Sequence, residues 1–203
     1  MDYRWILLCS WGAFSRANPR KIENFCSSKI PQVCSRGFMA CCRLCVYSQD
    51  LVLLMTKKIL AIASGGGHWQ QLMAMRPALA GHDTFYLTTL PGLPEQFGAA
   101  PARIIPDCNR DQKLAIVRTS AVLLRELLRH RPDVVISTGA LPGVIALALG
   151  RAIGARTIWV DSVANAEEMS MSGRLARRVA HLWMSQWEHV AKETGAEYAG
   201  AVL

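Results

Sequence analysis

Residues 57–68, KKILAIASGGGH, indicate the fold class more directly than any other segment. Two lysines precede five apolar residues, and a short continuous apolar run is typical of a buried strand in a parallel sheet. Serine, three glycines and a histidine follow, and Trp69, Leu72 and Met73 are then spaced as on one side of a helix. A strand, a glycine-rich turn and a helix in this order predict the opening unit of an α/β domain.

The same alternation continues along the chain after a Pro/Gly-rich loop at 91–94. Because strands alternate with helices, the sequence predicts one Rossmann-like, doubly wound parallel sheet with right-handed crossovers, over residues 55–203. The further strands are expected at 84–90, 102–105, 133–137, 156–160 and 182–185, and the further helices at 112–130, 144–153 and 172–181.

The helix over 112–130 has the clearest pattern. Its apolar residues recur at steps of three and four, the period of an α-helix. Arginines in its last turns suit the negative end of the helix dipole, and Pro132 ends it. The recurring positions are Leu114, Val117, Ala121, Leu124 and Leu128.

Three conspicuous loops follow strands, at 64–68, 138–143 and 161–165. In a sheet of this kind the ligand crevice lies at the carboxyl ends of the strands, so these loops are expected to meet on one rim. The polar residues on that rim include Asp161, Ser162 and Asn165.

The glycines of the first loop suit either a ligand or a tight turn. Gly65, Gly66 and Gly67 would let backbone amides approach an anion at a helix N-terminus. They do not form a dinucleotide fingerprint, because Gln70 stands where its third glycine belongs and Thr88-Thr89 ends the next strand in place of a carboxylate.

Two residues are candidates for catalysis. His68 at the helix start is expected to be a neutral imidazole that serves as general base, or else a histidine that only packs at the turn. Asp161 follows a predicted strand, and two roles are equally consistent with this position. It could be a catalytic carboxylate, or it could cap its own loop. Gly139 and Gly143 mark a turn with special backbone angles, and Gly139 could also admit a ligand.

Composition limits the remaining possibilities. The net charge of +8, shared evenly between the residues before Met55 and those from Met55 on, favours anionic partners, but no basic run with stacking aromatics suggests nucleic acid. Six of seven cysteines precede Met55, which leaves a disulfide framework or a zinc knuckle at Cys42 and Cys45 open. Residues 1–54 show no period and are expected to be a disordered extension or a misassigned start, or alternatively a membrane-proximal anchor.

The segment 172–187 combines arginines with apolar residues. It is either an ordinary surface helix, which is the preferred interpretation, or a helix that lies on an anionic bilayer.

Several ordered motifs resemble the oligosaccharide-biosynthesis glycosyltransferase-subunit family that includes the bacterial exopolysaccharide subunit PssD and the membrane-recruiting subunit of the eukaryotic dolichol-linked N-acetylglucosaminyltransferase. The chain is similar, more distantly, to the N-terminal half of MurG. The resemblance covers 57–203 and rests on SGGGH (64–68), ISTG (136–139) with Pro142-Gly143, IWVDSVAN (158–165), MSG (171–173) and SQWE (185–188).

This resemblance implies half of a GT-B glycosyltransferase. The chain would bind the acceptor, a separate small subunit would bind the UDP-sugar, and transfer to a polyprenyl-diphosphate-linked sugar would be inverting and free of metal and cofactor. The complex would lie peripherally at the cytoplasmic face of the membrane, in exopolysaccharide or lipid-linked oligosaccharide synthesis. By motif position, His68 is the base or an acceptor contact and Gly65 to Gly67 face the acceptor diphosphate. Asp161 stands where many relatives carry glutamate.

Two other functions remain open from the sequence. The chain could be a non-catalytic membrane scaffold that recruits the catalytic subunit, which full activity after replacement of both His68 and Asp161 would favour. A stand-alone nucleotide-binding domain would bind a nucleotide tightly without a partner.

Overall fold

The structure is a computed structural model that describes residues 56–202. The expectations for residues 1–54, including the cysteine cluster, lie outside the described residues.

Six strands form one sheet in the order β3-β2-β1-β4-β5-β6, and every pair of neighbours is parallel. This confirms the predicted α/β class with a doubly wound sheet. The chain order reverses between β1 and β4, where Ile62 lies opposite Ser137, and this reversal is the switch point at which such sheets bind ligands. The strands are β1 (Lys58–Ala63), β2 (Asp83–Thr88), β3 (Ala102–Ile104), β4 (Val134–Ser137), β5 (Arg156–Val160) and β6 (Leu182–Met184).

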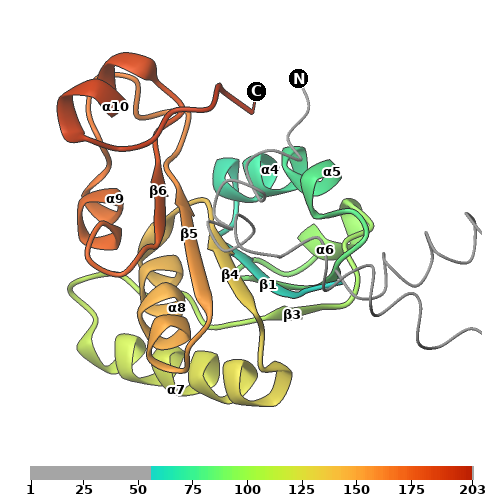
Figure 1. Ribbon diagram of the computed structural model, residues 1–203. Coiled ribbons are helices and arrows are strands. Elements are labelled where there is room, and N and C mark those ends of the chain that lie inside the picture. Colours follow the sequence, from blue (N-terminus) through green and yellow to red (C-terminus); the bar gives the residue numbers. More distant parts are fainter. Residues whose placement is uncertain (1–55, 203) are drawn as a thin grey trace, which may run out of the picture. The chain divides into compact units, whose positions relative to one another are not determined.

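Helices cover both faces of the sheet (Figure 1). On one face the Trp69 ring meets the edge of Tyr86, and on the other Leu87 shares a buried cluster with Leu123 and Leu127. Because neighbouring strand residues point to opposite faces, α4 packs on one face and α7 on the other. The helices are α4 (Gly67–Ala74), α5 (Arg76–Leu79), α6 (Leu93–Gln96), α7 (Lys113–His130), α8 (Ala140–Ala152), α9 (Met171–Ala176) and α10 (Glu188–Thr194).

The apolar runs read from the sequence are the buried strands. In β1, five of six residues are buried, and all four residues of β4 are buried. Each large aliphatic side chain removed from water in this way contributes about 1.5–3 kcal/mol of hydrophobic stabilisation. A sheet covered on both faces therefore explains why the strands read as continuous apolar segments.

Four details differ from the predicted elements. Helix α8 begins at Ala140 and not at 144, so most of the expected turn is its first helical turn. Helix α9 ends at Ala176 and not at 181. Helix α6 occupies part of the expected Pro/Gly loop, and α10 was not predicted.

The periodic apolar positions of α7 lie on its exposed side. Leu114 is 87% exposed and Val117 66%, whereas Leu123 and Leu127 are buried against the sheet. An apolar stripe of this kind usually faces the core. Here the helix carries two apolar sides, and periodicity alone could not say which one the sheet would cover.

Candidate functional site

The three loops predicted to meet do follow neighbouring strands. Strands β1, β4 and β5 are adjacent and parallel, so the loops after them share the carboxyl edge of the sheet. Side chains connect the loops directly. The Thr138 hydroxyl donates to the His68 carbonyl at 2.7 Å, and the Gln71 amide donates to the Ser162 hydroxyl at 3.0 Å.

His68 stands at the second residue of α4, and its imidazole lies over Gly139. A β-carbon built on Gly139 would come within 2.3 Å of the ring atoms Nδ1 and Cε1 of His68, so only glycine leaves room for the ring. The Nδ1 atom is buried and has no hydrogen-bond partner among the described residues. This nitrogen is therefore a buried polar atom without a partner among the described residues, on the side of the ring that packs against Gly139.

Burial lowers the pKa of His68 below its ordinary value of 6.5, while the negative charge of Asp161 and the backbone of Thr138 oppose part of that shift. The imidazole is therefore neutral at physiological pH and able to accept a proton. The influence of Asp161 on His68 also shows that the two predicted catalytic residues lie within electrostatic range of each other.

Gly65, Gly66 and Gly67 in the first loop differ in whether the fold itself requires glycine at that position. A β-carbon on Gly65 would come within 2.9 Å of the Leu90 side chain, and Gly66 has φ of 77°, a conformation that favours glycine. A β-carbon on Gly67 would have nothing within 4 Å. The fold therefore explains Gly65 and Gly66 but leaves open space at Gly67, where a ligand could approach the backbone.

The turn after β4 brings a second helix start to the same mouth. Helix α8 follows Gly139 with Ala140 at φ of 66°, a left-handed conformation that is strained for a non-glycine residue. Two helices, α4 and α8, thus begin beside His68, and backbone N–H groups at a helix N-terminus favour anions. Gly143 lies one turn further on, where a β-carbon would come within 2.0 Å of the Ser137 hydroxyl. Close packing of α8 on the sheet accounts for this glycine.

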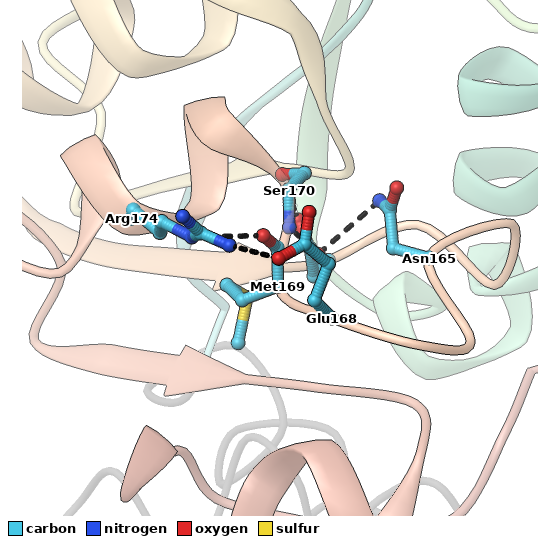
Figure 2. A network of polar contacts seen from close by, with 6 residues as sticks. Asn165, Glu168, Met169, Ser170 and Arg174 are labelled. Carbon is cyan, nitrogen blue, oxygen red and sulfur yellow. Dashed lines mark hydrogen bonds and ion pairs between the residues drawn. The ribbon is translucent and has the colours of Figure 1, made fainter. Parts of the chain in front are cut away.

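The loop after β5 is closed on itself around Asp161. The carboxylate is buried and accepts hydrogen bonds from the Trp159 indole at 3.1 Å, the Asn165 amide at 3.2 Å, and both the backbone and the hydroxyl of Ser170. Figure 2 shows Asn165 and Ser170 together with the other labelled residues of this polar network. Both carboxylate oxygens are engaged internally, so Asp161 fixes the loop and acts on His68 through its charge.

Arg174 adds an outer clamp to the same loop. It donates to the Met169 carbonyl and pairs with Glu168 (Figure 2). A neighbouring arginine, Arg177, lies over the Trp183 ring at 5.4 Å. These contacts give two arginines of the predicted basic segment roles within the domain.

A buried pair of glutamines, Gln71 and Gln186, joins the loops and was not predicted from the sequence. The Gln71 oxygen accepts from the Gln186 amide at 3.1 Å and from the Val163 backbone at 3.4 Å, and Gln186 also donates to the Asp161 carbonyl. Both side chains are buried. In the sequence, Gln71 stands next to the apolar Leu72 on the same predicted helix as His68. The sequence could not show which residues the Gln71 side chain contacts. The pair thus links α4 to the segments that follow β5 and β6.

Within residues 56–202, no three His, Cys, Asp or Glu side chains come together as a potential metal site. None of the helices in that range is long and apolar enough to cross a membrane. The site therefore consists of a neutral histidine, His68, next to Gly67, which faces open space. The N-termini of α4 and α8 lie on either side of it. This histidine could remove a proton from a hydroxyl group beside a bound anion.

The sequence matches no family model and no curated protein at a significant level. Solved structures with a similar fold include MurG from Acinetobacter baumannii, with a TM-score of 0.54 and 16% identity over 64% of this chain and 42% of that one. UDP-GlcNAc 2-epimerase from Neisseria meningitidis, bound to UDP-GlcNAc, has a TM-score of 0.54 and 12% identity over 70% of this chain and 46% of that one. The MnaA–UDP structure from S. aureus has a TM-score of 0.53 and 14% identity, over 68% and 40%.

The chain therefore spans less than half the length of these structures. At such low identity the likeness shows the fold alone. The described residues have the Rossmann-like fold of one half of a GT-B glycosyltransferase or epimerase.

Proposed function

We propose that this chain is the acceptor-binding subunit of a two-component, PssD-like glycosyltransferase in polysaccharide biosynthesis. It works with a small donor-binding subunit that holds a UDP-sugar, and its acceptor is a polyprenyl-diphosphate-linked sugar at the cytoplasmic face of the membrane. The observation that carries the proposal is the His68 imidazole, whose buried Nδ1 has no partner among residues 56–202 and which lies between two helix N-termini.

In the proposed reaction, His68 is the general base. The neutral imidazole takes the proton from an acceptor hydroxyl while that oxygen attacks the anomeric carbon of the donor sugar. The bond from that carbon to the UDP oxygen breaks, and UDP leaves with the bonding electron pair. Inversion at the anomeric carbon follows from a single displacement of this kind. General-base catalysis contributes about 10²–10⁴-fold to rate.

The amides at Gly67 and at the start of α8 are suited to the acceptor diphosphate. Backbone N–H groups at a helix N-terminus favour an anion, and the open space at Gly67 allows close approach. Asp161, Ser162 and Asn165 then hold the rim of the mouth, with Asp161 also biasing His68 through its charge.

The need for a second chain rests on the resemblance in motif order, together with the single Rossmann-like sheet built by the described residues. One such domain forms one wall of a GT-B crevice. The MurG and epimerase structures are more than twice as long as the part that aligns with this chain.

The test is reconstitution of the full chain with a candidate small donor-binding subunit. Transfer from a panel of UDP-sugars to a polyprenyl-diphosphate-linked sugar is measured for each protein alone and for the mixture. Transfer is expected only in the mixture. Efficient turnover of a UDP-sugar by this chain alone would overturn the proposal, and full activity of a mixture carrying both His68→Ala and Asp161→Ala would favour a scaffold.

A further inference from the structure

Gln71 is a buried amide that lies one turn along α4 from His68. Residues three apart on a helix are neighbours on its surface, so the two side chains leave α4 on the same side. The Gln71 side chain is buried, whereas the next residue back along the helix, Gln70, is exposed. A polar group removed from water is favourable only where its hydrogen bonds are made inside the protein, so the partners of Gln71 indicate why it is there.

Both ends of the Gln71 amide are engaged. Its oxygen accepts from the Gln186 amide at 3.1 Å and from the Val163 backbone at 3.4 Å. Its nitrogen donates to the Ser162 hydroxyl at 3.0 Å. Among the described residues, each side-chain hydrogen bond between α4 and the segments that follow β5 and β6 involves Gln71. The polar attachment of this helix to the two segments therefore depends on one side chain.

Gln186 continues the attachment from α4 to the backbone of Asp161. Its nitrogen donates both to the Gln71 oxygen and to the Asp161 carbonyl, the latter at 2.8 Å, and its oxygen accepts from the Val202 backbone at 2.9 Å. Because an amide nitrogen only donates and an amide oxygen only accepts, these partners allow one orientation for each of the two glutamine side chains. The network thus joins the helix that carries His68 to the residue whose charge acts on His68.

We infer that Gln71 is a positioning residue for His68. It holds α4 against the loop of Asp161 and so fixes the His68 ring relative to the Asp161 carboxylate. The Thr138 hydroxyl, which donates to the His68 carbonyl at 2.7 Å, attaches the start of the same helix to the loop after β4. A catalytic group must be held within about 0.5 Å of its productive geometry, and a misplacement of about 1 Å can lower the rate about 100-fold. The inference rests on the proposed function for the reaction that His68 serves.

The test compares variants of two adjacent glutamines in the reconstituted complex. Gln71→Met keeps the length of the side chain but removes its hydrogen bonds, and should lower kcat about 10–100-fold over the whole pH range. Gln70→Met changes an exposed position of the same helix and should alter kcat less than about twofold. Gln71→Glu keeps the oxygen that accepts from Gln186 and Val163, and should bring kcat back to within about fivefold of the wild type. Its added negative charge should also displace the pH profile to higher pH, because it favours the protonated form of His68.

Proton NMR of the histidine rings in the full chain alone gives a second measurement that needs neither substrate nor partner. The signal that is absent from His68→Gln identifies His68 among the five histidines. In Gln71→Met the midpoint of its titration should move up toward the ordinary value of histidine, because water reaches a ring that is no longer held in place. Gln70→Met should leave it unchanged. The signals of His82 and His181, at the amino ends of β2 and β6, should titrate as in the wild type in both variants.

The outcomes are distinct. Wild-type kcat in Gln71→Met would overturn the inference, and so would a loss of kcat with an unchanged His68 titration, since the effect would then not act through His68. Thermal melting reports whether each variant folds. If Gln71→Met does not fold, Gln186→Met decides, because it cuts the link to Asp161 and leaves two hydrogen bonds of Gln71 in place; unchanged kcat and titration there would also overturn the inference. If no protein transfers sugar but the His68 titration responds to Gln71→Met alone, the proposed function fails and the positioning role stands.

Discussion

The loops after β1 and β5 both carry a residue that the sequence marks as catalytic, but they use their polar groups in opposite ways. After β1, the buried Nδ1 of His68 has no partner among the described residues and Gly67 faces open space. After β5, both oxygens of Asp161 are engaged by donors from the same loop and strand. The comparison teaches that position at the carboxyl edge does not by itself assign chemistry. A polar residue beside open space can meet a ligand, whereas fully paired groups hold the site in shape.

The largest expected effect comes from removal of the unpaired imidazole. In the reconstituted complex, His68→Ala should lower kcat by about 10²–10⁴-fold, because a general base contributes that much. The melting temperature should change little, since no hydrogen bond to the ring nitrogen Nδ1 is lost within the described residues. Transfer assays and thermal melting on the same samples check both parts.

His68→Gln serves as the control for shape, since it keeps a polar side chain without a basic nitrogen. It should be as inactive as His68→Ala. Recovery of most of the activity by glutamine would mean that position 68 only holds a hydrogen bond.

The opposite behaviour is expected when Asp161 is replaced. Asp161→Ala leaves four donors without their acceptor, two of them on Ser170, and should lower the free energy of unfolding by about 2–4 kcal/mol. Denaturant unfolding measures this change. Asn165→Ala removes one of the four donors and should cost about 1 kcal/mol.

An Asp161→Ala variant as stable as the wild type would contradict the comparison, because the carboxylate would then not hold the loop. Equal losses for Asp161→Ala and Asn165→Ala would also contradict it.

The contrast between these loops marks how far the sequence could lead. The apolar runs predicted all six strands to within about two residues, and alternation predicted their parallel pairing, because burial on both faces and right-handed crossovers leave few alternatives. The meeting of the loops at 64–68, 138–143 and 161–165 followed from that topology.

The partners of side chains could not be read in the same way. Gln71 meets Gln186 across 115 residues of sequence, and Asp161 meets Ser170 in a loop without regular period. The sequence also did not predict which side of α7 is exposed. Two apolar rows on one helix have the same period, and packing against the sheet decides which row is buried. Side-chain hydrogen bonds and burial depend on how the whole chain packs. Whether a segment forms a helix or a strand depends largely on its own sequence.

Two glycine substitutions test the space on either side of His68, one in the loop after β4 and one in the loop after β1. Gly139→Ala would place a methyl group within 2.3 Å of the His68 ring, so the ring must move, at a cost of about 1–3 kcal/mol in unfolding free energy and with loss of transfer activity. Gly67→Ala meets nothing within 4 Å and lies at a helix start, so stability should stay within about 0.5 kcal/mol of the wild type.

The informative result is the activity of Gly67→Ala. If the acceptor diphosphate approaches this backbone, the variant should show a raised KM for the acceptor with an unchanged melting temperature. Unchanged KM would assign all three glycines to the turn alone.

The smallest expected effect concerns the pH dependence of stability. Burial lowers the pKa of His68 in the folded protein, while the unfolded chain titrates near 6.5. As the pH falls below about 6.5, His68 binds a proton in the unfolded state but stays neutral in the folded state. The free energy of unfolding therefore decreases. His82 and His181, whose pKa values burial also lowers, act in the same direction. Denaturant unfolding between about pH 7 and pH 5 should thus give a shallower decline for His68→Gln than for the wild type, with the remaining slope due to the other histidines. Parallel curves for the two proteins would mean that the His68 imidazole is protonated as readily in the folded domain as in the unfolded chain. That result would contradict the assignment of His68 as a neutral base.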